Sequence, residues 1–175
     1  MFRQAIRVSG APSASQTAAA VEALKIISGG QTGVDRAALD VALRRGVNCG
    51  GWCPAGRLDE FGKIPDQYPV QELPTGGFTE RTLQNVKYSD GTVVLYPGEL
   101  RGGTEQTVRF CVELERPRQA IDASKISAED AAKLIAEFVR ENKIGILNVA
   151  GPRQSDWPEG YDYASRALDT FLMAL

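Results

Sequence analysis

The sequence predicts an α/β protein, a Rossmann-like three-layer sandwich with a mainly parallel sheet and helices on both faces. Short apolar runs alternate with helix-length patterns from residue 24 onward, and glycine or proline follows most of the runs. Such alternation implies parallel strands joined by right-handed crossovers. With 175 residues, 43% hydrophobic and 24% charged, the composition fits a single globular domain. We expect this domain over residues 23–175 and a poorly ordered tail over residues 1–22.

The first half of the domain predicts a strand, a helix and a long loop. Residues 24–27 form a buried strand, which ends before Gly29 and Gly30. Apolar residues then recur at helical spacing to about Arg45, and Gly46 ends this helix. Residues 48–52 predict a short strand. The glycine- and proline-rich loop from residue 53 to about residue 77 has the length of a functional cover.

The second half repeats the alternation. We expect strands near residues 92–95, 120–121 and 144–149. Helices are predicted over residues 79–88, 102–114 and 127–142, and a last amphipathic helix includes residues 164–175.

Composition excludes several classes of function. The chain has no histidine, which removes Ser-His-Asp and Cys-His nucleophiles and histidine-ligated zinc. A formal charge of -2 provides no basic field for nucleic acid or an anionic membrane, and no apolar run is long enough to span a bilayer. Three cysteines, an odd number, favour a reducing, cytoplasmic location. The spacing of Cys49 and Cys53 is poor for a metal, so we predict no protein-ligated metal.

A glycine-rich turn between the first strand and its helix is the sharpest feature. Glycine lets a backbone approach a ligand closely, and amides at a helix N-terminus point at an anion. The alternative is a tight turn without a ligand. The candidate binding residues of this turn are Gly29, Gly30, Gln31, Thr32 and Gly33.

Two charged residues follow this turn. Asp35 stands three residues after Thr32, which fits either a capping box or a contact with a ligand. Arg36 opposes the helix dipole, and we expect it either to pair with Asp40 or to clamp a phosphate.

A second glycine turn opens the helix predicted from residue 102. Gly102, Gly103 and Thr104 would supply further amide donors at the same edge of the sheet. Thr104 or Thr107 would add a hydroxyl, although Thr104 also suits a helix N-cap. The two turns together predict a two-sided cradle for an anion.

Four further polar or aromatic residues are candidates. Trp52 would stack on a planar ring, or it would anchor the loop that follows it. Arg57 would contact a phosphate. Arg81 and Asn85 share one helix face, which is either part of the site or a solvated surface.

Five strings in the chain carry a family resemblance: SGGQTGVDRAALD at residues 28–40, GWCP at 51–54, RTxxNVxxSDGT at 81–92, GGT at 102–104 and NVAGPR at 148–153. They resemble the molybdenum (cofactor) carrier family, the circularly permuted YpsA-related branch of the SLOG, or lysine-decarboxylase-like, Rossmannoid proteins. The match runs from about residue 24 to the C-terminus.

The resemblance implies a Rossmann-like domain that binds a nucleotide or a pterin phosphate. It also implies a homo-oligomer, dimer or tetramer, and a molybdoenzyme as the client. Carried over position by position, it places residues 29–33, Asp35 and Arg36 in one wall of the site. Residues 102–104 form the other wall.

We therefore expect a binding or carrier protein for a phosphorylated heterocycle, with molybdenum cofactor (molybdopterin) or a nucleotide as the ligand. One alternative is a nucleoside-phosphate N-glycosidase-like hydrolase, with Asp35 or Glu105 as acid or base. Related phosphoribohydrolases carry P-G-G-x-G-T-x-x-E, whereas Arg101 precedes the glycine pair here and Thr107 replaces the glutamate. Another alternative is a sensor of a nucleotide ligand.

Overall fold

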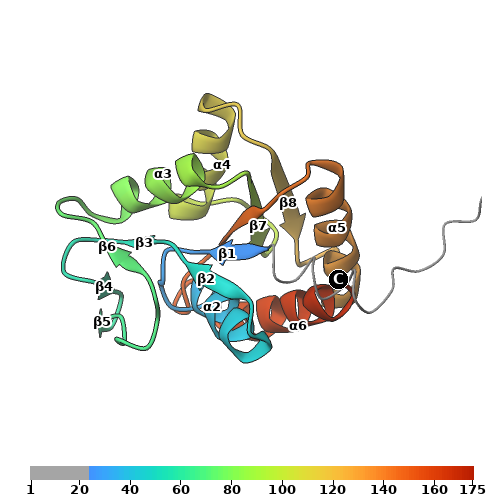
Figure 1. Ribbon diagram of the computed structural model, residues 1–175, viewed down its shortest axis with the longest axis horizontal. Coiled ribbons are helices and arrows are strands. Elements are labelled where there is room, and N and C mark those ends of the chain that lie inside the picture. Colours follow the sequence, from blue (N-terminus) through green and yellow to red (C-terminus); the bar gives the residue numbers. More distant parts are fainter. Residues whose placement is uncertain (1–23) are drawn as a thin grey trace, which may run out of the picture.

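A five-stranded parallel sheet forms the centre of the computed structural model, which describes residues 24–175. The prediction for residues 1–22 therefore lies outside the described residues. The strand order is β2-β1-β9-β7-β8, and every neighbouring pair runs parallel (Figure 1). The strands are β1 (Lys25–Ile27), β2 (Asn48–Gly50), β7 (Gly91–Tyr96), β8 (Arg118–Asp122) and β9 (Ile146–Ala150).

Five helices of the described chain cover both faces of this sheet. On one face, α6 packs between α2 and α5, and on the other α3 packs against α4 (Figure 1). The helices are α2 (Val34–Arg45), α3 (Phe78–Tyr88), α4 (Gly102–Glu113), α5 (Ala128–Glu141) and α6 (Gly160–Met173). The predicted three-layer Rossmann-like sandwich is thus confirmed. None of the described helices is long and apolar enough to cross a membrane.

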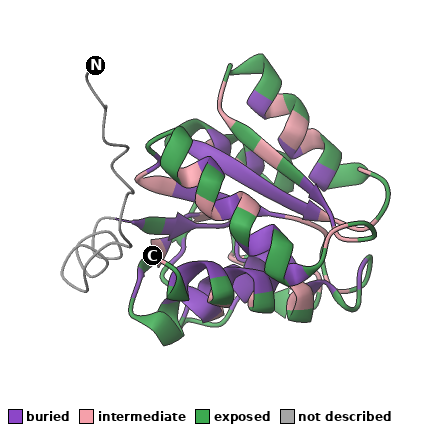
Figure 2. Cartoon of the chain, turned by 90° about the vertical axis from the view of Figure 1, so that its right-hand side faces the viewer, coloured by how far each residue is buried: buried purple, intermediate pink, exposed green. Residues whose placement is uncertain are grey.

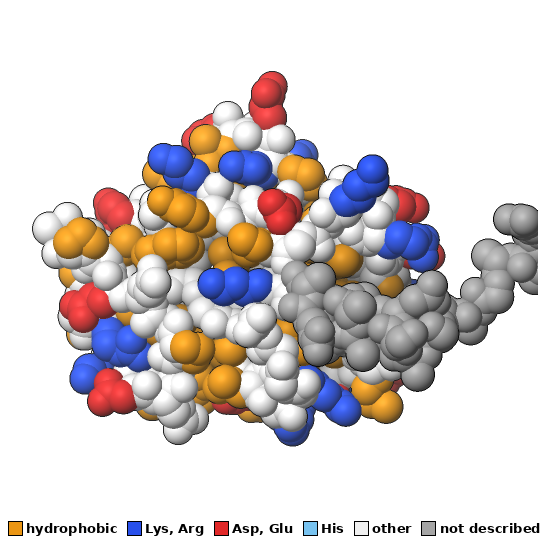
Figure 3. Space-filling view, viewed as in Figure 1, with side chains coloured by type: hydrophobic (Ala, Val, Ile, Leu, Met, Phe, Trp, Pro, Cys, Tyr) orange, Lys and Arg blue, Asp and Glu red, His pale blue; other side chains and the backbone are white. Residues whose placement is uncertain are grey.

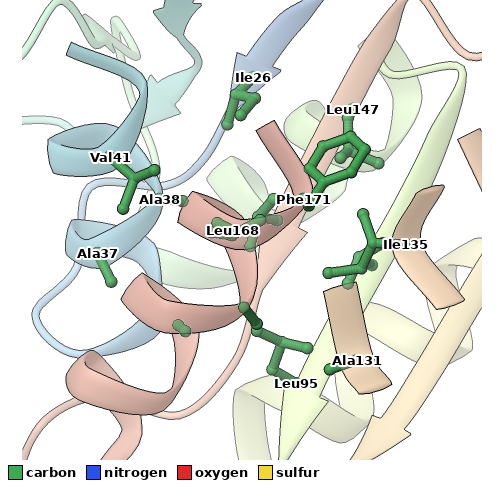
Figure 4. Close-up of a cluster of buried hydrophobic side chains, with 14 of the residues drawn as sticks. Ile26, Ala37, Ala38, Val41, Leu95, Ala131, Ile135, Leu147, Leu168 and Phe171 are labelled. Carbon is green, nitrogen blue, oxygen red and sulfur yellow. The ribbon is translucent and has the colours of Figure 1, made fainter. Parts of the chain in front are cut away.

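The main core lies between the sheet and the layer of α2, α5 and α6. Phe171 and Leu168 of α6 are fully buried against side chains of the strands and of α5, among them Leu147 and Ile135 (Figure 4). Small residues such as Ala37 let α2 pack closely against the sheet and against α6. The central strands β7 and β9 are buried over most of their length, whereas the edge strands β2 and β8 are partly exposed. Figure 2 shows buried residues in the middle of the sheet and exposed residues on the outward faces of the helices. Burial on one stripe of each helix explains the helical spacing in the sequence.

Helix ends follow local chemistry. Gly46 ends α2 in the left-handed conformation, with φ of 67°, as the sequence predicts. Ser127 caps α5 by accepting a hydrogen bond of 3.1 Å from the amide of Asp130.

The segment after β2 differs from the single strand predicted over residues 48–52. β2 ends at Gly50, and Gly51 turns the chain with φ of 118°. β3 (Trp52–Cys53) then leaves the main sheet and pairs with β6 (Gln71–Glu72). A hairpin of β4 (Leu58–Asp59) and β5 (Gly62–Lys63) lies between them.

The long loop over residues 53–77 has its own small core, built around Leu39 of α2 together with Ile64, Tyr68 and Val70. Arg57 ties the loop to itself. Its guanidinium donates to the carbonyls of Val70 at 2.8 Å and of Pro65 and Tyr68 at 3.1 Å. The loop is therefore a packed subsidiary layer.

Candidate functional site

A cavity of about 880 Å³ lies at the carboxyl ends of β1, β9 and β7. This is the position at which open parallel sheets bind ligands. Its lining comes from the turn after β1, from α3, from the start of α4 with the loop before it, and from the segment after β9. The lining residues are Gln31, Asp35, Phe78, Arg81, Thr82, Pro97, Gly98, Glu99, Arg101, Gly102, Gly103, Thr104, Gln106, Thr107, Ala150, Gly151, Pro152, Arg153, Ser155 and Asp156.

Asp35 is the buried carboxylate of the cavity, with 2% of its surface exposed. Its Oδ2 accepts from the amide of Gln31 at 3.4 Å and from Nη1 of Arg81 at 3.3 Å. Burial raises the pKa of Asp35, while the charge of Arg81 and the hydrogen bond from the Gln31 backbone N–H lower it, and burial dominates.

Of the two alternatives for Asp35, the capping box with Thr32 is wrong. Gly33 is the N-cap of α2 and makes no side-chain cap bond. The Thr32 hydroxyl instead donates to Glu60 and accepts from the amide of Gln154 at 3.1 Å. Asp35 is therefore free of a capping role and faces the cavity.

The raised pKa of Asp35 predicts a pH-dependent stability. The folded protein holds this proton more tightly than the unfolded chain does, so ionising Asp35 costs stability. The cost is absent below the aspartate's ordinary pKa and complete above the raised pKa. We expect the stability of Asp35→Asn, measured relative to the wild type by denaturant unfolding, to increase as pH rises through that window. A difference that does not change with pH would contradict this expectation.

Arg81 places a cation in the wall of the cavity. Its side chain is 13% exposed, and its Nε is buried without an acceptor in the described chain. A Cβ at Gly29 would lie 2.1 Å from Nη1 of Arg81. Gly29 does not itself line the cavity, and its role is to leave room for this guanidinium.

The start of α4 supplies backbone donors to the same cavity. Within residues 24–175, no group accepts a hydrogen bond from the amides of Gly102 and Gly103, and the N-cap Arg101 makes no side-chain cap bond. Thr104 is the third residue of the helix, so the alternative that made it the N-cap is wrong. The Thr107 hydroxyl donates to the carbonyl of Gly103 at 2.9 Å. The helix N-terminus is thus available to an anion.

The first glycine turn contributes less to the lining than the second. Of its five residues, Gln31 alone lines the cavity. Gly30, with φ of 73°, approaches Ile64 of the long loop, and Gly33 lies against the carbonyl of Pro152. These glycines shape the backbone around the cavity.

Two of the predicted cations lie outside the lining. Arg36 forms an ion pair of 2.9 Å with Asp59 and donates to the carbonyl of Gly30, and it does not pair with Asp40. Arg57 holds the long loop together, as described above. Glu105 is exposed and also lies outside the lining.

Trp52 and Asn85 likewise lie outside the lining. The amide of Trp52 donates to Asn85 Oδ1 and its carbonyl accepts from Asn85 Nδ2, both at 2.9 Å. The Trp52 ring packs on Tyr88 with centroids 4.4 Å apart. These contacts attach β3 to α3, which is the anchoring alternative for Trp52.

Sequence reasoning assigned no ligand contact to the segment after β9, although Ala150 to Arg153 and then Ser155 and Asp156 line the cavity. The NVAGPR string was a usable signal, because it ends a predicted strand at the same edge as the two glycine turns. Phe78 and Thr82 of α3 were also missed. Phe78 lies one helical turn before Arg81 and Thr82 lies four residues after Phe78, so this side of the helix was the signal.

The described residues contain no group of three or more cysteine, aspartate or glutamate side chains that could hold a metal ion. Acidic and basic side chains are interspersed on the face shown in Figure 3. In the cavity, Arg81 and Asp35 are the buried charges, whereas the other charged residues of the lining form the ion pairs Arg101–Glu99 and Arg153–Asp156.

Comparison with known proteins agrees with the fold and with the strings described above. The model of the "Circularly permutated YpsA SLOG family" matches residues 26–172. Among solved structures, the chain is similar to the crystal structure of the "Putative molybdenum carrier protein" from Syntrophus aciditrophicus SB. The two are 46% identical with a TM-score of 0.84, and the match covers 86% of this chain and 96% of that chain. Comparison with curated proteins gives no match. The chain belongs to the circularly permuted YpsA family of SLOG proteins.

Proposed function

We propose that this protein binds and carries a phosphorylated heterocycle, with the molybdenum cofactor as the first candidate and a nucleotide as the second. One observation carries the proposal: the Arg81 guanidinium lines the same cavity as the α4 N-terminus, whose first two amides have no acceptor within residues 24–175. A cation and a helix N-terminus are the groups that bind phosphate most readily in proteins.

The size and place of the cavity support a small organic ligand. A volume of about 880 Å³ falls within the range of small-molecule sites. Phe78, Pro97 and Pro152 provide apolar surface for a ring beside the polar groups. The name of the similar protein from Syntrophus aciditrophicus supports a molybdenum-containing cargo.

The residues present fit the organic part of the molybdenum cofactor. Arg81 and the amides of Gly102 and Gly103 would hold its phosphate. No cysteine lines the cavity formed by the described residues, so the metal would be carried by the ligand's own sulfur atoms. The chain's contribution is to bind the phosphate and to shield the ring from water.

Calorimetry with matched ligands tests this proposal. We expect AMP, GMP and molybdopterin to bind more tightly than adenosine and guanosine, because the nucleosides lack the phosphate. Gly103→Val should weaken this binding at least about ten-fold, because the valine side chain takes up the room beside the helix amides. The loss of a single hydrogen bond to the charged phosphate already corresponds to about ten-fold in affinity. A Cβ at Gly103 has no neighbour within 4 Å, so the fold should tolerate the substitution. Equal affinity for phosphorylated and unphosphorylated ligands would overturn the proposal.

A second candidate function is hydrolysis of a nucleoside phosphate at its glycosidic bond. The buried Asp35, whose pKa is raised by burial, favours it, because a carboxyl with a raised pKa keeps its proton to a higher pH and is better suited to general acid catalysis. Release of free base from a nucleoside monophosphate, lost in Asp35→Asn, would support hydrolysis. Intact substrate after prolonged incubation would exclude it.

A further inference from the structure

Gln31 enters the cavity with its amide group in a fixed orientation. Its Oε1 accepts hydrogen bonds from the amides of Thr32 at 2.9 Å and Glu60 at 3.0 Å. Both donors are backbone N–H groups, which identifies the oxygen and so places the NH₂ group on the other side of the carboxamide. Gln31 is 7% exposed and lines the cavity. It therefore offers a donor that no group of the described chain accepts.

Asp35 lines the same cavity and offers an acceptor. Its Oδ2 accepts hydrogen bonds from the backbone N–H of Gln31 and from Nη1 of Arg81, and these two bonds orient the carboxylate. The side chain lines the cavity although it is almost fully buried. A buried acceptor that water cannot fully solvate gains most from a ligand that donates to it.

From this donor and this acceptor in one cavity we infer that Gln31 and Asp35 read the 2-amino-4-oxopyrimidine edge that guanine and pterin rings share. The ring N–H and the exocyclic NH₂ would donate to the Asp35 carboxylate, and the ring carbonyl would accept from the Gln31 NH₂ group. The inference rests on the proposed function and names the class of heterocycle that the same cavity selects.

Adenine does not match this pair of side chains. Its N1 is an acceptor without hydrogen, so N1 would face the acceptor Asp35, and its exocyclic amine would face the donor Gln31. A site whose buried polar groups are left unpaired by the wrong ligand discriminates strongly against that ligand. The phosphate contacts of Arg81 and α4 would be the same for both rings, so the difference isolates the ring edge.

Dissociation constants for four phosphorylated rings test the inference. We expect GMP and 6-hydroxymethylpterin phosphate to bind the wild-type chain roughly ten-fold or more tightly than AMP, as for a good bidentate base contact. XMP, which has an oxo group in place of the 2-amino group, should bind as weakly as AMP. Tighter binding of the pterin than of GMP would identify a pterin as the source of this edge, and the reverse order would identify a guanine nucleotide. Both orders support the inference.

Asp35→Asn provides the sharpest variant. Asparagine keeps one acceptor for the ring N–H and adds an NH₂ donor that matches the 2-oxo group of xanthine. The preference should therefore shift from GMP toward XMP by roughly ten-fold or more. Asp40→Asn is the matched control on the same helix, because Asp40 accepts from the hydroxyls of Tyr68 at 2.8 Å and Tyr161 at 2.7 Å, outside the cavity. This control should keep the preference for GMP.

Gln31→Glu keeps the test available if Asp35→Asn does not fold. It replaces the donor by an acceptor, so it should weaken GMP binding and relieve the mismatch with the exocyclic amine of AMP, which lowers the preference for GMP over AMP. Equal affinity for GMP and AMP in the wild type, or an unchanged GMP to XMP ratio in a folded Asp35→Asn variant, would overturn the inference and leave phosphate binding intact. Failure of every phosphorylated ring to bind would overturn the inference together with the proposed function.

Discussion

Arg81→Met is expected to weaken the binding of GMP about 100-fold, which is the upper range for a hydrogen bond to a charged group. Methionine keeps most of the length and apolar surface of the side chain and removes the charge. Two other arginines line the cavity, but Arg101 is exposed and paired with Glu99, and Arg153 is paired with Asp156 at 2.9 Å. Neither has the burial of Arg81, so neither should replace it.

Isothermal calorimetry with GMP measures this loss of affinity. Circular dichroism confirms that the variant is folded. Arg166→Met is the control, since Arg166 forms an exposed ion pair with Glu129 away from the cavity. Gly29→Ala tests the same cation without removing it, because the added Cβ would occupy the place of Nη1 and displace the guanidinium. Unchanged GMP affinity in both Arg81→Met and Gly29→Ala would mean that Arg81 does not bind the phosphate.

The sequence predicts the sheet and most of the helices around it, because burial of one side of each element gives its apolar residues a regular spacing. α2, for example, buries Val34, Ala37, Ala38 and Val41, and it ends at Gly46 as expected. The short β3 and β6 were not predicted, because a pair of two-residue strands leaves no period to read. Their pairing depends on how the long loop folds back on itself.

The sequence indicates where the candidate site lies, but it does not indicate which of the candidate residues line the cavity. Glycine turns after β1 and before α4 do stand at one edge of the sheet, because parallel strands end there. Of the predicted cations, Arg81 lines the cavity and Arg36 does not, for a physical reason. Arg36 follows the first turn in the sequence, but its partner Asp59 lies 23 residues further on and turns it away from the cavity. Arg81 comes from a helix on the other face and reaches the cavity over Gly29.

Gly51→Ala is expected to destabilise the protein by roughly 3 kcal/mol or more, the sum of a strained backbone and an overpacked contact. Gly51 has φ of 118°, a conformation that alanine rarely adopts. Its Cβ would also lie 2.2 Å from the carbonyl oxygen of Ser28 and 2.7 Å from the Ser28 nitrogen. Both are backbone atoms at the end of β1, so they cannot move aside as a flexible side chain can.

Gly46→Ala separates these two costs. Gly46 is also left-handed, with φ of 67°, but a Cβ there meets nothing within 4 Å, so we expect a loss of only about 1 kcal/mol. Denaturant unfolding of the two variants should therefore show a clear excess for Gly51→Ala, and equal losses would show that the contact with Ser28 does not matter. Ser28 donates to the carbonyl of Val149 at 3.0 Å, which fixes the end of β1 to β9. Because the turn that begins at Ser28 leads to Gln31 and Asp35, the glycine at position 51 protects the geometry of the cavity although it is not part of the lining.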